Sequence, residues 1–200
     1  PVPESGWEVG AVCLPLPGED ESGDNWGVSF RRGGISVVVA DGLGHGPEAA
    51  VASTAAVGVS LDFDNGPPGA RIEDAHGALR STRGAAVAIA EIDSYDGKLL
   101  FAGVGNIAAS IISNGPRRHL LSHNGIVGSN LRKVQEFEQP WDSSSLLILA
   151  SDGINTRWDL SPYPGLAFSH ASVIAAVLYR DFQRGRDDAT VVVVREHAAS

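Results

Sequence analysis

Five aspartates stand at the ends of apolar segments that read as buried strands. A carboxylate at the edge of a core is costly unless a cation, an arginine or backbone N–H groups neutralise it. These residues are therefore the first candidates for chemistry. They are Asp41 after ISVVVA, Asp152 after SLLILA, Asp24 before NWGVSF, and Asp187 and Asp188 before ATVVVV.

The residue types suit hard divalent cations. Mg²⁺ and Mn²⁺ prefer carboxylate, carbonyl and water oxygens. Two such ions about 4 Å apart, bridged by a carboxylate, can activate water for attack on phosphorus. Gly42 follows Asp41 and has no side chain, so its carbonyl can turn toward the same point, and Gly44 and Gly46 let the chain pass close by. The pattern predicts a site for two Mg²⁺ or Mn²⁺ ions.

Turn chemistry is the alternative explanation. Asp-Gly is a common turn dipeptide, and either of the pairs Asp41-Gly42 and Asp152-Gly153 could be a plain turn. Two such pairs after fully apolar strands, together with the other strand-end aspartates, favour a metal site more than either pair does alone. From the pattern alone, both interpretations stay open.

The elements that must position these residues are mostly short strands. The apolar runs are rich in β-branched residues and are separated by Gly, Asn, Asp or Pro. Asp96-Gly97 predicts a tight hairpin turn, and SNGP at 113–116 predicts a second turn. The predicted strands are 7–14, 25–30, 35–40, 85–92, 98–105, 107–113, 119–121, 134–139, 145–150 and 189–194.

Two segments predict helices, and a third does so more weakly. Residues 47–61 open with Pro47 and Glu48, which are typical of a helix start. Residues 171–184 place apolar residues at helical spacing, with Ser169 or His170 as the N-cap. The weaker helix is expected over 71–82, after the breaker DNGPPG.

The order of these elements predicts the fold class. They do not alternate as β-α-β units, so a doubly wound parallel sheet is disfavoured. We expect an α+β protein with two mainly antiparallel sheets and helices packed outside them. The chain has 200 residues, 43% of them hydrophobic, which suits a single domain over 1–200.

Composition excludes several functions. The formal net charge of −9 argues against nucleic-acid binding, which usually needs a basic face. We find no apolar run near the roughly 20 residues that span a bilayer and no signal-peptide pattern, so we expect no membrane association. The single cysteine, Cys13, cannot form an intramolecular disulfide, which indicates a reducing, cytoplasmic location. It is expected to pack as a small hydrophobic residue.

Three further polar features lie near the acidic motifs. His45 could contact substrate, although capping of the next helix or a supporting hydrogen bond is the favoured interpretation. Asn106 is expected to serve turn geometry. The arginine-rich stretch RDFQRGRDD is expected to be a solvated helix end.

The motifs VADGLGHGPEAA, GVGNIAASII, LLILASDGI and RDDATVVVV resemble, in this order, the SpoIIE group of bacterial PP2C-type protein phosphatases. Within it, the short RsbX-like stressosome phosphatases are most similar, and the resemblance spans residues 22–195. It implies a four-layer α-β-β-α sandwich (PP2C-like) and a metal-dependent phosphoserine and phosphothreonine phosphatase. It also implies a one-step mechanism, in which metal-activated water attacks phosphorus and no phospho-enzyme forms.

The resemblance also implies roles for single residues. Asp41 matches the carboxylate that bridges both ions, and Gly42 the carbonyl ligand of one. Asp152 and Asp187 match ligands of the second ion, and Asp24 matches an acid on the other. Asp188 completes the acidic pair, and the motif leaves open which of the two binds directly. Larger relatives hold the substrate phosphate with an arginine near their start. No arginine precedes Arg31 here, so the phosphate is expected to rest on the metals alone.

The implied substrate is a phosphorylated STAS-domain protein of a stress-response or partner-switching pathway, and the enzyme is expected to be a monomer. Two rival functions stay open. One is a phosphoprotein-binding module without turnover. The other is a two-metal hydrolase of a small phosphoester or nucleotide.

Overall fold

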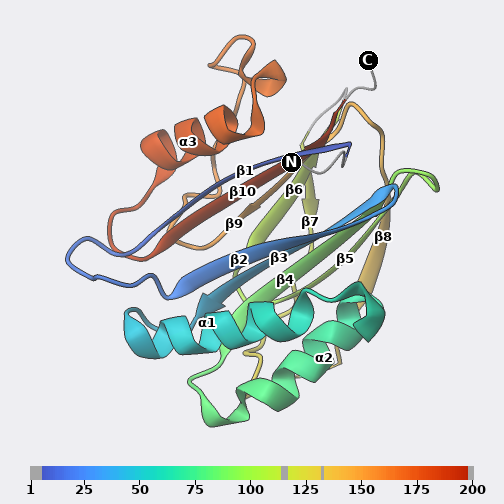
Figure 1. The fold of residues 1–200 in the computed structure, drawn as a ribbon. Helices are drawn as coiled ribbons and strands as arrows, with labels where there is room; N and C mark the ends of the chain where they lie inside the picture. The colour runs from blue at the N-terminus through green and yellow to red at the C-terminus, as the bar shows by residue number, and fades with distance from the viewer. Residues whose placement is uncertain (1–5, 114–116, 132, 198–200) are drawn as a thin grey trace.

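The computed structural model describes residues 6–113, 117–131 and 133–197, and its core is two five-stranded antiparallel sheets (Figure 1). Sheet A has the order β1-β10-β9-β6-β7 and sheet B the order β2-β3-β4-β5-β8. The strands are β1 Trp7–Leu14, β2 Asp24–Arg31, β3 Gly34–Gly42, β4 Ala85–Asp93, β5 Lys98–Val104, β6 Ala108–Ile112, β7 Arg118–Leu120, β8 Glu136–Pro140, β9 Leu146–Ala150 and β10 Ala189–Glu196.

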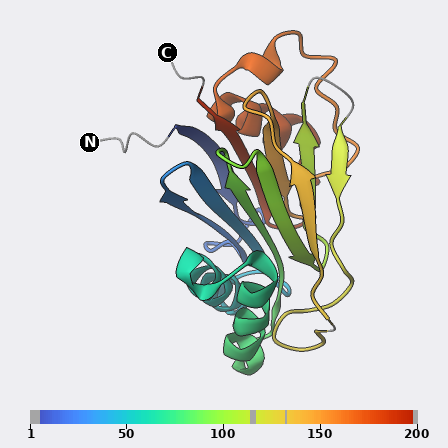
Figure 2. The ribbon, with the colours of Figure 1, turned by 90° about the vertical axis from the view of Figure 1, so that its right-hand side faces the viewer.

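Helices cover the outer faces of both sheets. The helix α3, Ala171–Phe182, packs on sheet A against β1 and β10. The helices α1, Pro47–Ser60, and α2, Pro68–Ala78, pack on sheet B. The view in Figure 2, turned by 90°, shows the two sheets between these helices. The predicted α-β-β-α layers are thereby confirmed.

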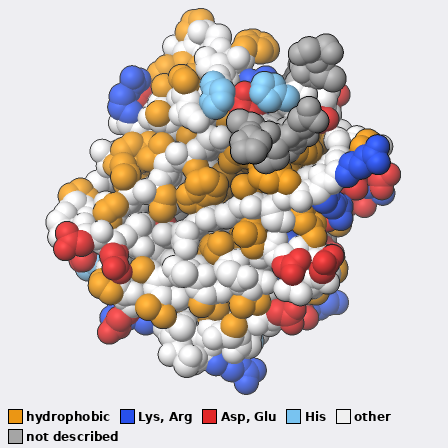
Figure 3. All heavy atoms as spheres, in the orientation of Figure 1, with side chains coloured by type: hydrophobic (Ala, Val, Ile, Leu, Met, Phe, Trp, Pro, Cys, Tyr) orange, Lys and Arg blue, Asp and Glu red, His pale blue; other side chains and the backbone are white. Residues whose placement is uncertain are grey.

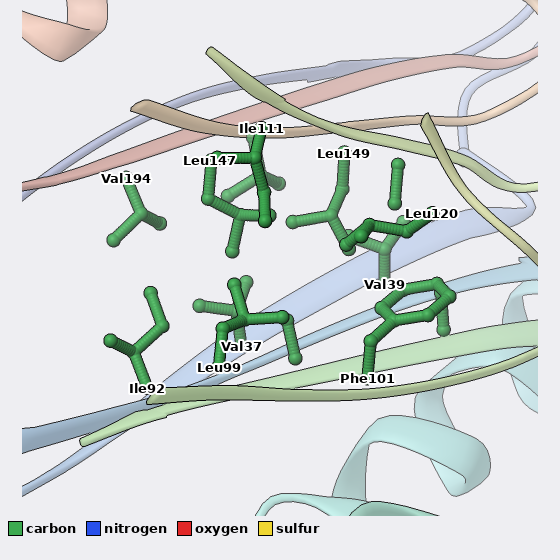
Figure 4. Close-up of a cluster of buried hydrophobic side chains, with 14 of the residues drawn as sticks. Val37, Val39, Ile92, Leu99, Phe101, Ile111, Leu120, Leu147, Leu149 and Val194 are labelled. Carbon is green, nitrogen blue, oxygen red and sulfur yellow. The ribbon is translucent and has the colours of Figure 1, made fainter. Parts of the chain in front are cut away.

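Each strand at the centre of the sandwich is buried on both faces. On β3, Val37 and Val39 point between the sheets, whereas Val38 and Ala40 point toward α1 and α2. This alternation follows from the two-residue period of a strand. It explains why the run is apolar throughout. Figure 4 shows the core between the sheets, where β3 side chains meet residues such as Leu149 of β9.

Charges are sparse at the centre of the face shown in Figure 3, and Lys, Arg, Asp and Glu gather toward its margins. This side of the molecule carries β1 and β2, the edge strands of the two sheets, whose Val9, Ala11 and Val28 pack against the core. No helix within the described residues is long and apolar enough to cross a bilayer.

The predicted elements are confirmed, with bounds within two residues of those predicted except at the two ends of α2. All ten strands form, and α3 has the predicted cap, because His170 Nδ1 accepts a hydrogen bond from the backbone N–H of Ser172. The helix α2 begins at Pro68 rather than at residue 71. Proline is tolerated at the first helical position, where its missing N–H is not needed. The predicted turn at 113–116 falls largely on residues 114–116, which lie outside the described residues.

Cys13 is partly buried at the end of β1, with Sγ 3.5 Å from the carbonyl oxygen of Asp24. Burial raises the pKa of its thiol. Both observations agree with the predicted packing role.

Candidate metal centre

The strand ends that carry the aspartates meet at one end of the sandwich, on the left in Figure 1. Asp24 begins β2 and is the direct cross-strand partner of Asp41 near the end of β3. Asp41 shares the face of Val37 and Val39, which point between the sheets. Like charges directly opposite each other in an antiparallel pair repel. The backbone register alone therefore concentrates negative charge at this point.

Asp41 has the least compensated carboxylate of the group. It is partly buried, and no described residue donates a hydrogen bond to it. Burial, followed by the charges of Asp24, Asp152, Asp187 and Asp188, raises the pKa of Asp41 to about 9. A carboxylate in this position is stabilised by protonation or by a cation.

Asp24 is buried more deeply, with 5% of its surface exposed. Its Oδ2 accepts a hydrogen bond of 2.6 Å from Ser151 Oγ, and Ser151 Oγ accepts one of 2.9 Å from the backbone N–H of Thr190. Burial raises the pKa of Asp24 to about 7, and the hydrogen bond from Ser151 opposes this shift. Asp24 is thus more deeply buried than Asp41, and its hydrogen bond with Ser151 connects β2 of sheet B to the end of β9 in sheet A.

Asp152 and Asp187 line the same cleft as Asp41. The side-chain amide of Asn106 donates a hydrogen bond of 2.6 Å to Asp152 Oδ2. Burial, followed by the charge of Asp152, raises the pKa of Asp187. Three carboxylates from two sheets therefore face one open space.

Asp188 has a different environment from its neighbour Asp187. It is buried, and its two oxygens accept hydrogen bonds from the backbone N–H groups of Leu16, at 2.7 Å, and Gly23, at 2.8 Å. These bonds fix the loop between β1 and β2. The structure therefore gives Asp188 a bracing position, whereas Asp187 faces the cleft.

The glycines after Asp41 and Asp152 are required by close backbone contacts. A Cβ atom on Gly42 would lie 2.1 Å from the carbonyl oxygen of Ala49 in α1. A Cβ atom on Gly153 would lie 2.0 Å from the carbonyl oxygen of Asp188. Any side chain at either position would thus force the backbone apart. Turn propensity alone does not explain the two Asp-Gly pairs.

The cleft has a volume of about 500 Å³ and opens to solvent. His45 lies on its wall, where Nδ1 is 2.7 Å from Glu19 Oε1. It does not cap α1, which has no side-chain cap. The residues that line the cleft are Asp41, Leu43, Gly44, His45, Ala86, Gly105, Asn106, Asn124, Gly125, Ile126, Asp152, Arg186 and Asp187.

For two of these lining residues the sequence predicts other roles. It predicts turn geometry for Asn106 and a solvated helix end around Arg186, and the structure places both at the cleft. The contact of Asn106 with Asp152 joins residues 46 positions apart, and no local pattern reports such a pair. The signal for Arg186 was its place directly before Asp187.

The donor set fits a hard divalent cation. Carboxylates crowd together, and among the described residues none donates a hydrogen bond to Asp41 and no lysine lines the cleft. Carboxylate oxygens are the ligands that Mg²⁺ and Mn²⁺ prefer. Within the described residues, however, no three His, Cys, Asp or Glu side chains already form a closed cation cage. The carboxylates would therefore have to draw closer around an ion.

Comparison with solved structures places the fold in the PP2C class, whose members are metal-dependent serine/threonine phosphatases. A chain from a structure of the bacterial stressosome, described as a modular system adapted to control secondary messenger signalling, has 31% identity and a TM-score of 0.88. The match covers 94% of this chain and 99% of that one. RsbX in complex with magnesium has 21% identity and a TM-score of 0.81, with 95% of each chain covered.

A third structure is the catalytic domain of the serine/threonine phosphatase PstP with two manganese ions. It has 16% identity and a TM-score of 0.73, and the match covers 94% of this chain and 97% of that one. No curated protein sequence matches the chain. The family model for stage II sporulation protein E (SpoIIE) matches residues 31–197, so the chain belongs to the SpoIIE family. The predicted family and the predicted magnesium or manganese cofactors are confirmed.

Proposed function

We propose that the protein removes phosphate from phosphoserine or phosphothreonine on a STAS-domain regulator of a partner-switching pathway, and that it acts as a monomer. The observation that carries the proposal is the partly buried Asp41 carboxylate, which faces the cleft with Asp152 and Asp187 and accepts no hydrogen bond from any described residue. Family membership and the stressosome relative support the choice of substrate.

In this proposal, Asp41, Asp152, Asp187 and the Gly42 carbonyl would hold two Mn²⁺ or Mg²⁺ ions. Bound there, the ions would supply the Lewis acidity needed for direct attack of water on phosphorus. Asp24 and Asp188 would support these ligands from more deeply buried positions. Asp24 accepts a hydrogen bond from Ser151, and Asp188 accepts two from backbone amides.

The remaining cleft residues have supporting tasks. Asn106 holds Asp152 through its 2.6 Å hydrogen bond and so limits the positions of that carboxylate. Glu19 orients His45 on the cleft wall. Leu43, half-exposed on the rim, supplies apolar surface for the protein that carries the phosphate.

The test is phosphate release from a phosphoserine STAS-domain protein, measured with Mn²⁺, with Mg²⁺ and with EDTA. We expect release with either metal and none with EDTA. Asp41→Asn should lower the rate at least about 10³-fold, because it removes a carboxylate that would hold the metal ions. Asp74→Asn, on the exposed face of α2, is the matched control and should behave as wild type.

Two outcomes would redirect the assignment. Phosphoprotein binding without release, in folded and metal-loaded protein, would indicate a binding module. Faster hydrolysis of p-nitrophenyl phosphate or nucleotides than of any phosphoprotein would indicate a small-phosphoester hydrolase.

A further inference from the structure

Arg186 lines the cleft, but the proposed metal centre does not use it. It lies on the loop between α3 and β10, directly before Asp187, and shares the cleft with Asp41 and Asp152. Its side chain is exposed, and no described residue forms an ion pair or hydrogen bond with it. A guanidinium that stands beside carboxylates without pairing to them is available for a ligand.

The other arginines either have partners or lie outside the cleft. Arg83, beside Gly44, forms an ion pair with Glu48. Arg117 stacks on Trp158 and donates to backbone carbonyl oxygens. Arg184 is exposed but does not line the cleft. Among the described residues, Arg186 is therefore the one arginine that faces the cleft.

The loop that carries Arg186 is anchored on both sides. Before it, the backbone N–H of Arg184 donates a 2.8 Å hydrogen bond to the carbonyl oxygen of Gly153. After it, the Asp188 carboxylate is fixed by the amides of Leu16 and Gly23. These anchors restrict the backbone of Arg186, while its side chain stays free at the cleft.

We propose that Arg186 binds the non-bridging oxygens of the substrate phosphate. This inference rests on the proposed phosphatase function. A phosphate monoester carries about two negative charges at neutral pH, and here it must enter a cleft lined by carboxylates. A guanidinium offers two parallel N–H donors that match two phosphate oxygens. Arg186 thus supplies, from the far end of the sequence, the phosphate-binding arginine that was expected to be missing.

The test measures phosphate affinity separately from turnover. Calorimetry would follow inorganic phosphate binding to Mn²⁺-loaded wild type, Arg186→Ala, Arg186→Lys and Arg184→Ala. We expect Arg186→Ala to weaken phosphate binding about 10- to 100-fold, because a charge-assisted hydrogen-bonded pair is lost. Arg186→Lys should recover part of the affinity, since lysine keeps the charge without the fork. Arg184→Ala should match wild type.

Mn²⁺ affinity, measured on the same four proteins, controls for damage to the neighbouring Asp187. We expect it to stay within about twofold of wild type, and we expect KM for the phosphoprotein to rise more than kcat falls. Unchanged phosphate affinity in Arg186→Ala would overturn the proposal, and so would a loss of Mn²⁺ affinity that accounts for the weaker phosphate binding. If wild type binds phosphate through Arg186 yet hydrolyses no phosphoprotein, the proposed function fails, whereas the assignment of Arg186 as a phosphate-binding residue stands.

Discussion

The protein buries Arg71 of α2 against sheet B, and at the strand ends it buries Asp24 and partly buries Asp41. The side chain of Arg71 is fully buried, and it donates to Ser36 Oγ, to the carbonyl oxygen of Ser60 and to Glu91 Oε2. Glu91 supplies the opposite charge, and both terminal nitrogens of the guanidinium donate hydrogen bonds, while Nε has no partner among the described residues. Asp41 has four acidic neighbours and no hydrogen-bond donor among the described residues.

The comparison separates two uses of buried charge. A buried ion pair with satisfied hydrogen bonds fixes how elements pack, and breaking it destabilises the fold. A buried group of like charges opposes folding until a ligand neutralises it. The ion pair of Arg71 with Glu91 joins α2 to sheet B. The aspartates at the strand ends instead form a site that is stabilised when it binds a cation.

The largest stability effect is expected at Arg71. Arg71→Met should lower the free energy of unfolding by about 3 kcal/mol, because Glu91 and Ser36 lose a buried partner. Urea denaturation measures the change. Arg31→Met removes the more exposed partner of Glu91 and should cost less than about 1 kcal/mol. Equal losses in the two variants would contradict the distinction between the buried and the exposed arginine.

Substitution of Asp41 should raise, rather than lower, the free energy of unfolding of the metal-free protein. Its folded-state pKa of about 9 lies above the ordinary value of 3.8, so the folded state binds the proton more tightly. The contribution of Asp41 to the free energy of unfolding is fully present below about pH 4 and is lost as the pH rises toward 9. At pH 8 in EDTA, the free energy of unfolding of Asp41→Asn should therefore exceed that of wild type by about 1–3 kcal/mol. The variant should accordingly unfold at a higher urea concentration.

Urea curves of both proteins between pH 5 and pH 9 would test this sign. The free energy of unfolding of the variant should depend less steeply on pH than that of wild type. The remaining slope should come from Asp24, whose pKa is raised to about 7. Added Mn²⁺ should stabilise wild type more than the variant. A variant that is less stable than wild type at pH 8 in EDTA would show that the carboxylate repulsion is not dominant.

The smallest effect is expected at Asn106. Asn106→Ala leaves Asp152 without its amide donor, and we expect about tenfold weaker Mn²⁺ binding with little change in stability. Calorimetric titration with Mn²⁺ measures the affinity. Asn130→Ala, which changes an exposed asparagine that does not line the cleft, is the control. If Asn106→Ala binds Mn²⁺ as tightly as wild type, Asn106 does not support Asp152 in metal binding.

Much of the fold could be predicted because its strands are buried on both faces. Runs such as 35–40 and 189–194 are apolar throughout, and the strand-end aspartates stand out against them. The start of α2 was harder to place, since Pro68 reads equally well as a loop residue and as a first helical residue.

The site was only partly predictable, because contacts between distant residues leave no local pattern. Asp187 and Asp188 are adjacent and chemically identical in the sequence. The amides of Leu16 and Gly23, more than 160 residues away, hold the Asp188 carboxylate in its buried position, whereas Asp187 lines the cleft. The same limit applies to Asn106, whose partner Asp152 belongs to a different motif.

The position of β10 has a consequence for synthesis on the ribosome. This strand inserts between β1 and β9, and the register pairs each of them with it rather than with each other. Until residues 189–196 have left the exit tunnel, β1 has no hydrogen-bonded neighbour in its sheet and Asp188 cannot fasten Gly23. The acidic strand ends therefore cannot come together before β10 is made, and a nascent chain that stops before β10 would leave the facing edges of β1 and β9 unpaired.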